Sequence, residues 1–243
     1  MFTSKRITTL GGNKFRDEYS LAFDGTDDNI SITETTYDVD GGTVSFVFWV
    51  KRAALDEIRM ILGHTGASGI DYIQFDSSNR LSIESSTNGN RAYGTPNTED
   101  LEWHHYVISV SSGTVTMWQD GIALSITGDT SSGDMKINCI GGSGTSGVVY
   151  EWNGNISEIA IYNIALTSNQ AKTLFNGREP FDHKDWAKSG NLTQWWRMGD
   201  GSLDSFGYNG IVGDETDIAI GSELITNGTM LNMTASDFVG DTP

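Results

Sequence analysis

Apolar and polar residues alternate in many short runs along the chain, and clusters of Gly, Asn, Asp and Ser separate the runs. Alternation with a period of two is typical of β-strands that bury one face, and a long series of such strands is typical of a sandwich or a barrel. The segment 43–51 differs, because apolar side chains such as Phe46 and Val47 occupy both faces. A strand buried on both faces is expected in the middle of a sheet.

The segment 103–127 predicts three consecutive strands. The turn Ser112-Gly113 separates the first two alternating runs, and the turn Asp120-Gly121 separates the second from the third. An Asp-Gly pair between alternating runs is a strong β-hairpin signal. We therefore expect a three-stranded antiparallel meander.

Two other segments lead to more local predictions. Residues 20–34 form two alternating runs around the turn 24–28, which predicts an opening pair of strands. In 153–163, Ile156 lies at one parity and Ile159 at the other. A β-bulge between them would return both side chains to the buried face.

A helical segment is expected near 167–176. Thr167 is a suitable N-cap, and Gln170 at the third position after it completes a capping box. Leu174 and neighbouring apolar residues form a stripe, and Gly177 is expected to end the helix. The pattern as a whole predicts an all-β protein, an antiparallel two-sheet β-sandwich with one short helix.

The alternating pattern divides the chain into three parts. It is dense over 20–212, and a chain of 243 residues is suited to one large β-sandwich. Residues 1–19 and 213–243 lack sustained periodicity and mix Gly, Asn, Asp and Thr with isolated apolar residues. Such segments bury too little apolar surface to offset the entropy lost on ordering. We therefore expect an N-terminal arm and a loop-rich C-terminal segment, both of which become ordered against a partner.

The charge balance narrows the classes of partner. Lys and Arg total 15 and Asp and Glu total 32, a formal net charge of −17, and the charges are dispersed along the chain. Nucleic acid is not expected as a partner, because contacts with its phosphates require clustered basic residues. Membrane insertion is not expected either, since no apolar run reaches the ~20 residues that span a bilayer. The single cysteine, Cys139, is expected to be a buried free thiol.

Four segments resemble, in their order along the chain, the laminin-G-like or concanavalin A-like lectin/glucanase jelly-roll domains. They are SLAFDGTDDNISI, GGTVSFVFWVKR, LEWHHYVISVSSGTVTMWQDGIAL and YEWNGNISEIAIYNIALTSNQAKTLFN, which together span about residues 20–176. The sequence from WWRMGDG onward is similar to the modules of this type found in marine tailed-phage virion proteins. The resemblance implies a jelly-roll fold, whose functions include carbohydrate recognition, protein adhesion and particle architecture.

The resemblance favours a non-enzymatic structural or adhesive protein on the surface of a tailed-phage particle, either a capsid decoration or a fibre or appendage component. Its expected partners are other virion proteins, further copies of itself as a trimer or a dimer, and host surface polysaccharide. A lectin that binds host polysaccharide is one alternative, and a secreted or cell-surface bacterial adhesin is another. The virion location agrees with an N-terminus that lacks the apolar region of a secretory signal peptide.

Catalysis is not expected. Glucan-cleaving jelly rolls need carboxylates at alternate positions of one strand, so that the acid and the nucleophile share a face. Glu151 and Glu158 do not alternate in this way, and no predicted strand carries such a run. His104 and His105 are adjacent in a strand, so their side chains are expected on opposite faces and not as a chelating pair.

Calcium is the cofactor that the sequence suggests. Asp24, Asp27 and Asp28 crowd one short turn. Calcium prefers oxygen ligands and would relieve the repulsion between the three carboxylates. The resemblance agrees, since many laminin-G-like domains hold calcium. The alternative is a solvated turn in which Asp24 accepts hydrogen bonds from backbone amides.

Two tryptophans are candidate platforms for a sugar ring. Trp152 precedes the predicted turn at Asn153, and Trp186 lies in a polar connector, so both are expected to be exposed. We expect Trp152, Asn153 and Trp186 to contact carbohydrate, although an exposed Trp can equally anchor a protein interface. The tryptophans expected in the core are those of the central strands, namely Trp49, Trp103 and Trp118.

Overall fold

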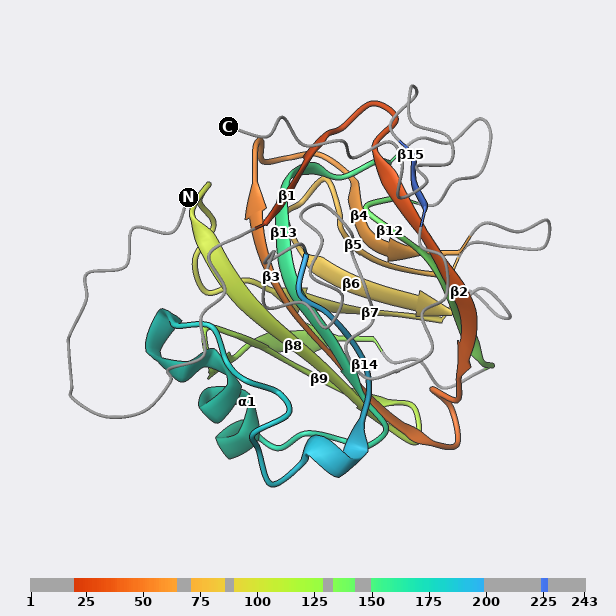
Figure 1. Cartoon of the computed structure of the whole chain (residues 1–243), viewed down its shortest axis with the longest axis vertical. Helices are drawn as coiled ribbons and strands as arrows, with labels where there is room; N and C mark the ends of the chain where they lie inside the picture. Colours follow the sequence, from red (N-terminus) through yellow and green to blue (C-terminus); the bar gives the residue numbers. More distant parts are fainter. Residues whose placement is uncertain are drawn as a thin grey trace, which may run out of the picture.

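Two antiparallel β-sheets pack face to face in a computed structural model of the chain (Figure 1). The structure describes residues 20–64, 71–85, 90–128, 133–142, 150–198 and 224–226. Within these ranges it contains one α-helix, and every strand pairing is antiparallel. The prediction of an all-β, two-sheet sandwich with one short helix is therefore confirmed.

The first sheet has the strand order β1-β13-β3-β8-β9-β10, and β14 pairs with β13 outside this path. Strand β3 is hydrogen-bonded to β13 on one side and to β8 on the other, and it is buried on both faces, as predicted for the segment 43–51. The bounds are β1 Leu21–Asp24, β3 Thr43–Arg52, β8 Trp103–Ser111, β9 Thr114–Gln119, β10 Ile122–Ala123, β13 Asn153–Tyr162 and β14 Leu192–Trp196.

The second sheet has the order β11-β7-β6-β5-β4-β12-β2-β15. Its bounds are β2 Asn29–Tyr37, β4 Arg59–Gly63, β5 Tyr72–Phe75, β6 Leu81–Ser85, β7 Asn90–Thr95, β11 Ser125–Thr127, β12 Met135–Ile140 and β15 Leu224–Thr226. The meander β8-β9-β10 is confirmed, and the chain then crosses to this sheet at β11.

The predicted opening pair of strands is wrong. Strand β1 pairs with β13 in the first sheet, whereas β2 pairs with β12 and β15 in the second sheet. The turn 24–28 therefore crosses between the two sheets instead of closing a hairpin. A turn of this length lacks the two-residue geometry that fixes hairpin pairing, so alternation on either side of it does not show which sheet each strand joins.

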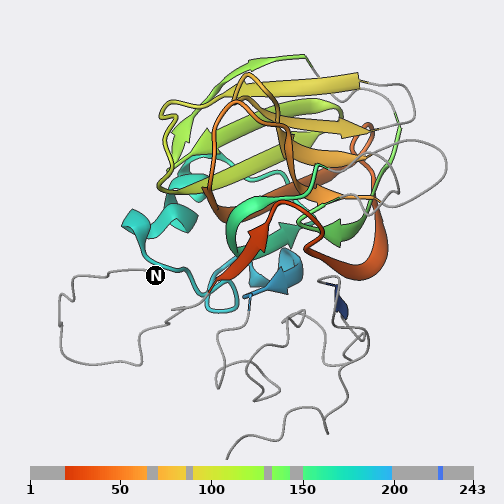
Figure 2. The same ribbon diagram turned by 90° about the horizontal axis from the view of Figure 1, so that it is seen from above.

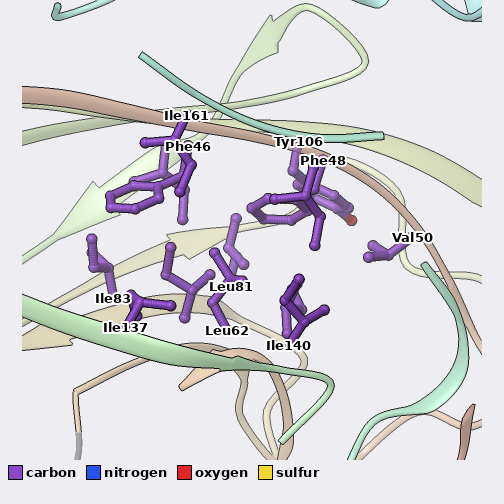
Figure 3. Packing of buried hydrophobic residues seen from close by; sticks show 14 of the residues in the cluster. Phe46, Phe48, Val50, Leu62, Leu81, Ile83, Tyr106, Ile137, Ile140 and Ile161 are labelled. Atoms are coloured by element: carbon purple, nitrogen blue, oxygen red, sulfur yellow. The ribbon is translucent and has the colours of Figure 1, made fainter. Parts of the chain in front are cut away.

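The core lies between the two sheets, where side chains from their inner faces interdigitate (Figure 3). Phe46, Phe48 and Tyr106 of the first sheet face Leu62, Leu81 and Ile83 of the second sheet. Removing one such apolar side chain from water stabilises the fold by roughly 1.5–3 kcal/mol. The predicted bulge in β13 is also confirmed: the register with β3 shifts between Ser157 and Ala160, so that Ile156 and Ile159 both reach this core.

Helix α1 (Ser168–Phe175) lies against the outer face of the first sheet (Figure 1, Figure 2). Thr167 caps its N-terminus and forms the predicted capping box with Gln170. At its C-terminus Asn176 and then Gly177 adopt left-handed conformations, with φ of 48° and 65°. Ala171 and Leu174 of the helix join a second apolar cluster with Val47, Val107, Trp118, Tyr162 and Trp195. The short 3₁₀ helices η1 (Asn176–Arg178) and η2 (Ser189–Asn191) belong to the connector that leads to β14.

The predicted terminal segments lie mostly outside the described residues. Residues 1–19 are not described, and of 213–243 the structure describes only 224–226, which form β15 beside β2. Their docking role therefore stays a prediction. In the described part of the chain, no helix is both long enough and apolar enough to cross a bilayer.

Candidate functional site

The acidic turn, defined as residues 24–28, joins β1 to β2 and carries the three aspartates of the predicted metal site. Asp24 Oδ1 accepts a hydrogen bond from Thr26 N at 2.7 Å, and Asp28 Oδ2 accepts one from Asp24 N at 3.0 Å. One carboxylate oxygen from each of Asp24, Asp27 and Asp28 lies within 4.8 Å of the others. The structure therefore brings the three predicted residues together around one small volume.

The acidic turn lies directly against the start of β13. Asp24 is paired with Asn153, the residue predicted to contact carbohydrate. Gly25 makes this approach possible: its φ is +78°, and a Cβ at this position would lie only 2.8 Å from Cβ of Asn153. A predicted metal-binding residue and a predicted sugar-binding residue are thus neighbours in space, although the chain separates them widely.

A fourth carboxylate, which the sequence did not suggest as a ligand, lies near Asp27 and Asp28 but outside the group of three aspartates. Glu151 is only 5 % exposed, and its Oε2 is buried without a hydrogen-bond partner. Burial, together with the negative charges of Asp27 and Asp28, raises the pKa of the Glu151 carboxyl to about 7. A buried carboxylate oxygen without a donor is costly and rare in folded proteins, so it points to a positive group that belongs beside it.

Two neighbouring residues shape the space around Glu151. A Cβ at Gly142 would overlap Oε2 of Glu151, so only glycine leaves room for this carboxylate. Arg59 of β4 donates from Nη1 to the carbonyl oxygens of Gly25 and Glu151, at 3.2 and 3.0 Å. Its charge is paired with Glu57 at 2.8 Å. Arg59 therefore joins the acidic turn to Glu151 through hydrogen bonds to their backbones. Its charge is neutralised by Glu57 and not by the carboxylates of the candidate site.

The donor set fits a hard divalent cation. All four side chains offer oxygen atoms, which suit calcium, whereas zinc and copper sites usually include nitrogen or sulfur. Asp24 and Asp27 are exposed and Glu151 is buried, so an ion held by the three aspartates would have solvent on one side and the Glu151 carboxylate nearby. Such an ion would attract the Glu151 carboxylate, which would have to shift to contact it, and would leave coordination positions for water or ligand oxygens.

A second acidic group, Asp38, Asp40 and Asp134, has a different environment. All three side chains are exposed. Backbone amides already serve its carboxylates: Gly41 N donates to Asp38 at 2.7 Å, and Gly133 N donates to Asp40 at 2.8 Å. Backbone hydrogen bonds from Gly41 and Gly42 lower the pKa of Asp38. Since no buried oxygen lacks a partner here, we assign this group no ion.

The predicted exposure of Trp152 is wrong. Its side chain is 0 % exposed and lies in the core between the sheets, 6.1 Å from the ring of Phe75. Trp152 immediately precedes β13, with its side chain in the core, and proximity to a turn does not oppose burial of so large an apolar surface. A ring in this position cannot stack on a sugar.

Trp186 is not a free platform either. It is half-buried in the second apolar cluster, with its ring 5.6 Å from Tyr162 and 5.7 Å from Phe181 in edge-on contacts. Of the predicted sugar-binding residues, only Asn153 borders the acidic turn. The core positions predicted for Trp49 and Trp118 are confirmed, while Trp103 is only half-buried.

His104 and His105 lie on opposite faces of β8, as predicted. His104 is held between two carboxylates, with Nδ1 at 2.8 Å from Asp120 and Nε2 at 2.9 Å from Asp100. Burial alone would lower its pKa, but these hydrogen bonds and charges outweigh burial and raise it. His105 instead packs between Trp49 and Phe175 on the other face. His104 thus connects β8 to Asp100 and Asp120, and His105 connects β8 to helix α1 through Phe175.

Comparison with known proteins identifies the class of protein to which the chain belongs. The family model of the concanavalin A-like lectin/glucanases superfamily matches residues 24–172, and the chain belongs to this family. No curated protein sequence matches the chain.

Solved structures of similar fold share little sequence with the chain. A protein of Bacteroides ovatus, described as a candidate carbohydrate binding protein, superposes with a TM-score of 0.60 at 16 % identity over 82 % of this chain. The chain spans 56 % of that protein's length. A sialidase of Trypanosoma rangeli matches with a TM-score of 0.45 at 19 % identity, over 56 % of this chain and 23 % of the sialidase. A pentraxin of Limulus polyphemus matches with a TM-score of 0.43 at 15 % identity, over 63 % of this chain and 84 % of its own.

These comparisons correct the prediction that the chain is not an enzyme. Sialidases are among the structures of similar fold, and the family includes glucanases as well as lectins. Membership in this family therefore does not exclude catalysis, and the absence of an alternating carboxylate run excludes only one arrangement of catalytic residues. The sialidases match at 17–19 % identity with a TM-score of 0.45, so none of their activity is transferred to this chain.

Proposed function

We propose that the chain is a carbohydrate-binding module in which a calcium ion, held by the acidic turn and Glu151, takes part in binding saccharide hydroxyl groups. The observation that carries this proposal is the buried Oε2 of Glu151, which has no partner and lies beside Asp27 and Asp28. Family membership supports the carbohydrate ligand, since lectins of this family bind sugars.

Charge and exposure explain how the ion would serve binding. Without a cation, burial and then the negative charges of Asp27 and Asp28 raise the pKa of Glu151 and drive it toward its neutral form. A calcium ion takes 6–8 oxygen ligands, at roughly 2.3–2.6 Å. Vicinal hydroxyls of a sugar would fill the positions on its open side. The half-buried amide of Asn153, paired with Asp24, would offer a hydrogen bond to the same sugar.

The test joins metal binding to sugar binding on the intact chain. Calcium should raise the melting temperature of the wild type, because a ligand that binds only the folded state stabilises it. Glu151→Gln and Asp28→Asn should lose most of this increase and should also lose calcium-dependent binding on a glycan array. Asp38→Asn in the second acidic group is the matched control and should behave as the wild type.

Two outcomes would refute the proposal. The first is a wild-type melting curve that is the same in calcium and in EDTA. The second is a calcium response that Glu151→Gln leaves intact, which would place the ion elsewhere.

A structural and adhesive role on the surface of a tailed-phage particle is the second proposal. It is supported by the resemblance of the sequence from WWRMGDG onward to virion modules, and by an acidic net charge of −17 that suits a crowded particle surface. Other virion proteins, further copies of the chain and host polysaccharide would then be its partners. Mass spectrometry of purified particles tests it: many copies per particle support a decoration, few copies support an appendage, and absence overturns the proposal.

A further inference from the structure

Two buried histidines lie on the outer face of the first sheet, beneath helix α1 and the connector that leads from it to β14 (Figure 1). We call α1 and this connector, residues 168–191, the outer strap. His105 of β8 is 1 % exposed, and His183 of the connector is 2 % exposed. A charged imidazole in such a position is costly, because burial removes its hydration.

The surroundings of His105 favour a neutral ring. Its ring lies 5.1 Å from the ring of Trp49 and 6.2 Å from that of Phe175 in α1. Its Nδ1 is buried and has no hydrogen-bond partner among the described residues. Both ring nitrogens carry a proton in the charged form, so Nδ1 would become a buried donor without an acceptor. Burial outweighs the negative charge of Asp120 and lowers the pKa of His105 to about 3.

His183 joins the middle of the connector to the sheet. Its Nδ1 lies 2.5 Å from the hydroxyl of Tyr162 in β13, and its ring contacts Trp195 of β14 edge-on at 5.2 Å. A neutral ring protonated on Nε2 accepts a hydrogen bond from Tyr162 through Nδ1, and protonation of Nδ1 removes this acceptor. Burial, and then a positive charge on His105, lower the pKa of His183 to about 3.

The charged groups around the two histidines do not offset their burial. The titratable and charged side chains that face the pair are Glu158 and Tyr162 of β13, Asp120 after β9, Asp182 and Lys184 of the connector, and Arg197 after β14. Lys172, the charged residue of α1, is exposed. Glu158 Oε2 lies 4.0 Å from His183 Nε2, too far for a hydrogen bond, and accepts one from Trp195 Nε1 at 2.6 Å. Asp120 is likewise engaged by His104 and Arg178.

The outer strap is separate from the main core. Its buried side chains, Ala171 and Leu174, belong to the second apolar cluster, and Phe181 and Trp186 are only partly buried against that cluster. Residues 179–188, all of which the structure describes, form neither helix nor strand. Segments with few buried contacts and little regular hydrogen bonding open more readily than core strands.

We propose that the outer strap is released by acid: protonation of His105 and His183 detaches residues 168–191 from the first sheet while the two-sheet core stays folded. Release uncovers the outward-facing rings of Tyr162 and Trp195, which the strap buries at neutral pH. The histidine pair has no residue in common with the acidic turn, so this device does not depend on the proposed function.

The direction of the pH effect follows from the form that binds the protons. The attached strap keeps both histidines neutral, with pKa values of about 3, whereas an uncovered histidine returns toward 6.5. Attachment is therefore strongest above pH 6.5 and weakens as the pH falls from 6.5 toward 3. Each histidine shifts the equilibrium toward release by about tenfold per pH unit in this range.

Amide hydrogen exchange of the intact chain, followed by mass spectrometry from pH 7.5 to 4.5 and corrected for the intrinsic exchange rate, tests the proposal. Below pH 6.5 the protection of peptides from 168–191 should fall by up to about 100-fold per pH unit, tenfold for each histidine. Peptides from β3 and β8 should keep their protection. His183→Gln keeps a polar side chain beside Tyr162 but does not titrate, so protection should fall by only about tenfold per pH unit.

Two further variants complete the test. His105→Gln should reduce the pH dependence in the same way and serves if His183→Gln folds poorly. His64→Gln is the matched control, because His64 lies beside β4 of the second sheet, paired with Glu34 at 2.9 Å, and it should keep the wild-type pH dependence. The inference is overturned if the protection of 168–191 in the wild type does not change with pH, or if β3 and β8 lose protection together with it. An unchanged pH dependence in both His183→Gln and His105→Gln overturns it as well.

Discussion

The carboxylate of Glu151 occupies the space that a side chain at Gly142 would need, because a Cβ there would overlap Oε2. Gly142→Ala must therefore displace the carboxylate or the backbone. Overpacking of a buried site costs roughly 1–3 kcal/mol, which corresponds to a fall in melting temperature of about 2–4 °C per kcal/mol in a chain of this size. The calcium-induced rise in melting temperature should shrink as well.

Gly190→Ala is the control for this prediction, since a Cβ at that position meets nothing within 4 Å. Differential scanning fluorimetry in calcium and in EDTA measures both effects. A Gly142→Ala protein with the wild-type melting temperature and calcium response would show that the carboxylate is free to move elsewhere at no cost.

Glu151 should make the chain less stable at high pH when calcium is absent. Its pKa rises from 4.5 to about 7 on folding, so the folded state binds this proton more tightly than the unfolded state. The contribution to stability is full below pH 4.5 and is lost as the pH rises through 7. In EDTA, Glu151→Gln should therefore be more stable than the wild type at pH 8, by up to ~3 kcal/mol.

Urea unfolding in EDTA at several pH values measures this difference. The gap between Glu151→Gln and the wild type should narrow steadily as the pH falls toward 5. A gap that is independent of pH would mean that Glu151 is not ionised at pH 8 in the folded protein, or that a donor already serves it.

The sequence predicted those features that depend on neighbouring residues. Thr167 and Gln170 lie within one helical turn, so their capping box was visible in the order of residues. The parity change between Ile156 and Ile159 likewise required a bulge, because both side chains are apolar and must reach one core. In each case a local rule of geometry was sufficient.

The features that were missed depend on which strands meet. Alternation around the turn 24–28 does not show that β1 and β2 belong to different sheets. Glu151 becomes a neighbour of Asp28 only because β13 pairs with β1, and an acidic residue next to the Asn153 turn was the one available signal. Trp152 was misplaced since a turn signal describes the backbone and not the burial of the side chain before it.

His104 should contribute stability at acidic and neutral pH that is lost in alkaline solution. Its ring lies between Asp100 and Asp120, with the ring of Tyr106 at 6.2 Å and with Arg178 3.5 Å from Asp120. The pKa of His104 is raised above 6.5, so the folded state holds the imidazolium proton more tightly. This contribution is full below pH 6.5 and is lost as the pH rises through the higher, folded-state value.

His104→Gln keeps a polar side chain but removes the charge. Hydrogen bonds to a charged group contribute about 1.5–3 kcal/mol, so the variant should be less stable than the wild type by roughly that amount at pH 6 and by less at pH 9. Chemical unfolding at the two pH values checks the direction. A larger deficit at pH 9 than at pH 6 would contradict the assignment of His104 as a protonated residue between two carboxylates.

Substitution of the two candidate tryptophans should separate packing from recognition. Trp152 is 0 % exposed in the main core, so Trp152→Ala should cost about 3–5 kcal/mol, the range for loss of a large buried ring. Trp186 is half-buried against Tyr162 and Phe181, and Trp186→Ala should cost clearly less. Urea unfolding gives both values. Saccharide binding, measured at low temperature where both variants are folded, should match the wild type in Trp186→Ala, because its ring packs on neighbouring aromatic rings and lies outside the proposed site. Loss of binding in Trp186→Ala with the fold intact would indicate that the connector between α1 and β14 contacts the sugar, as the sequence first predicted for Trp186.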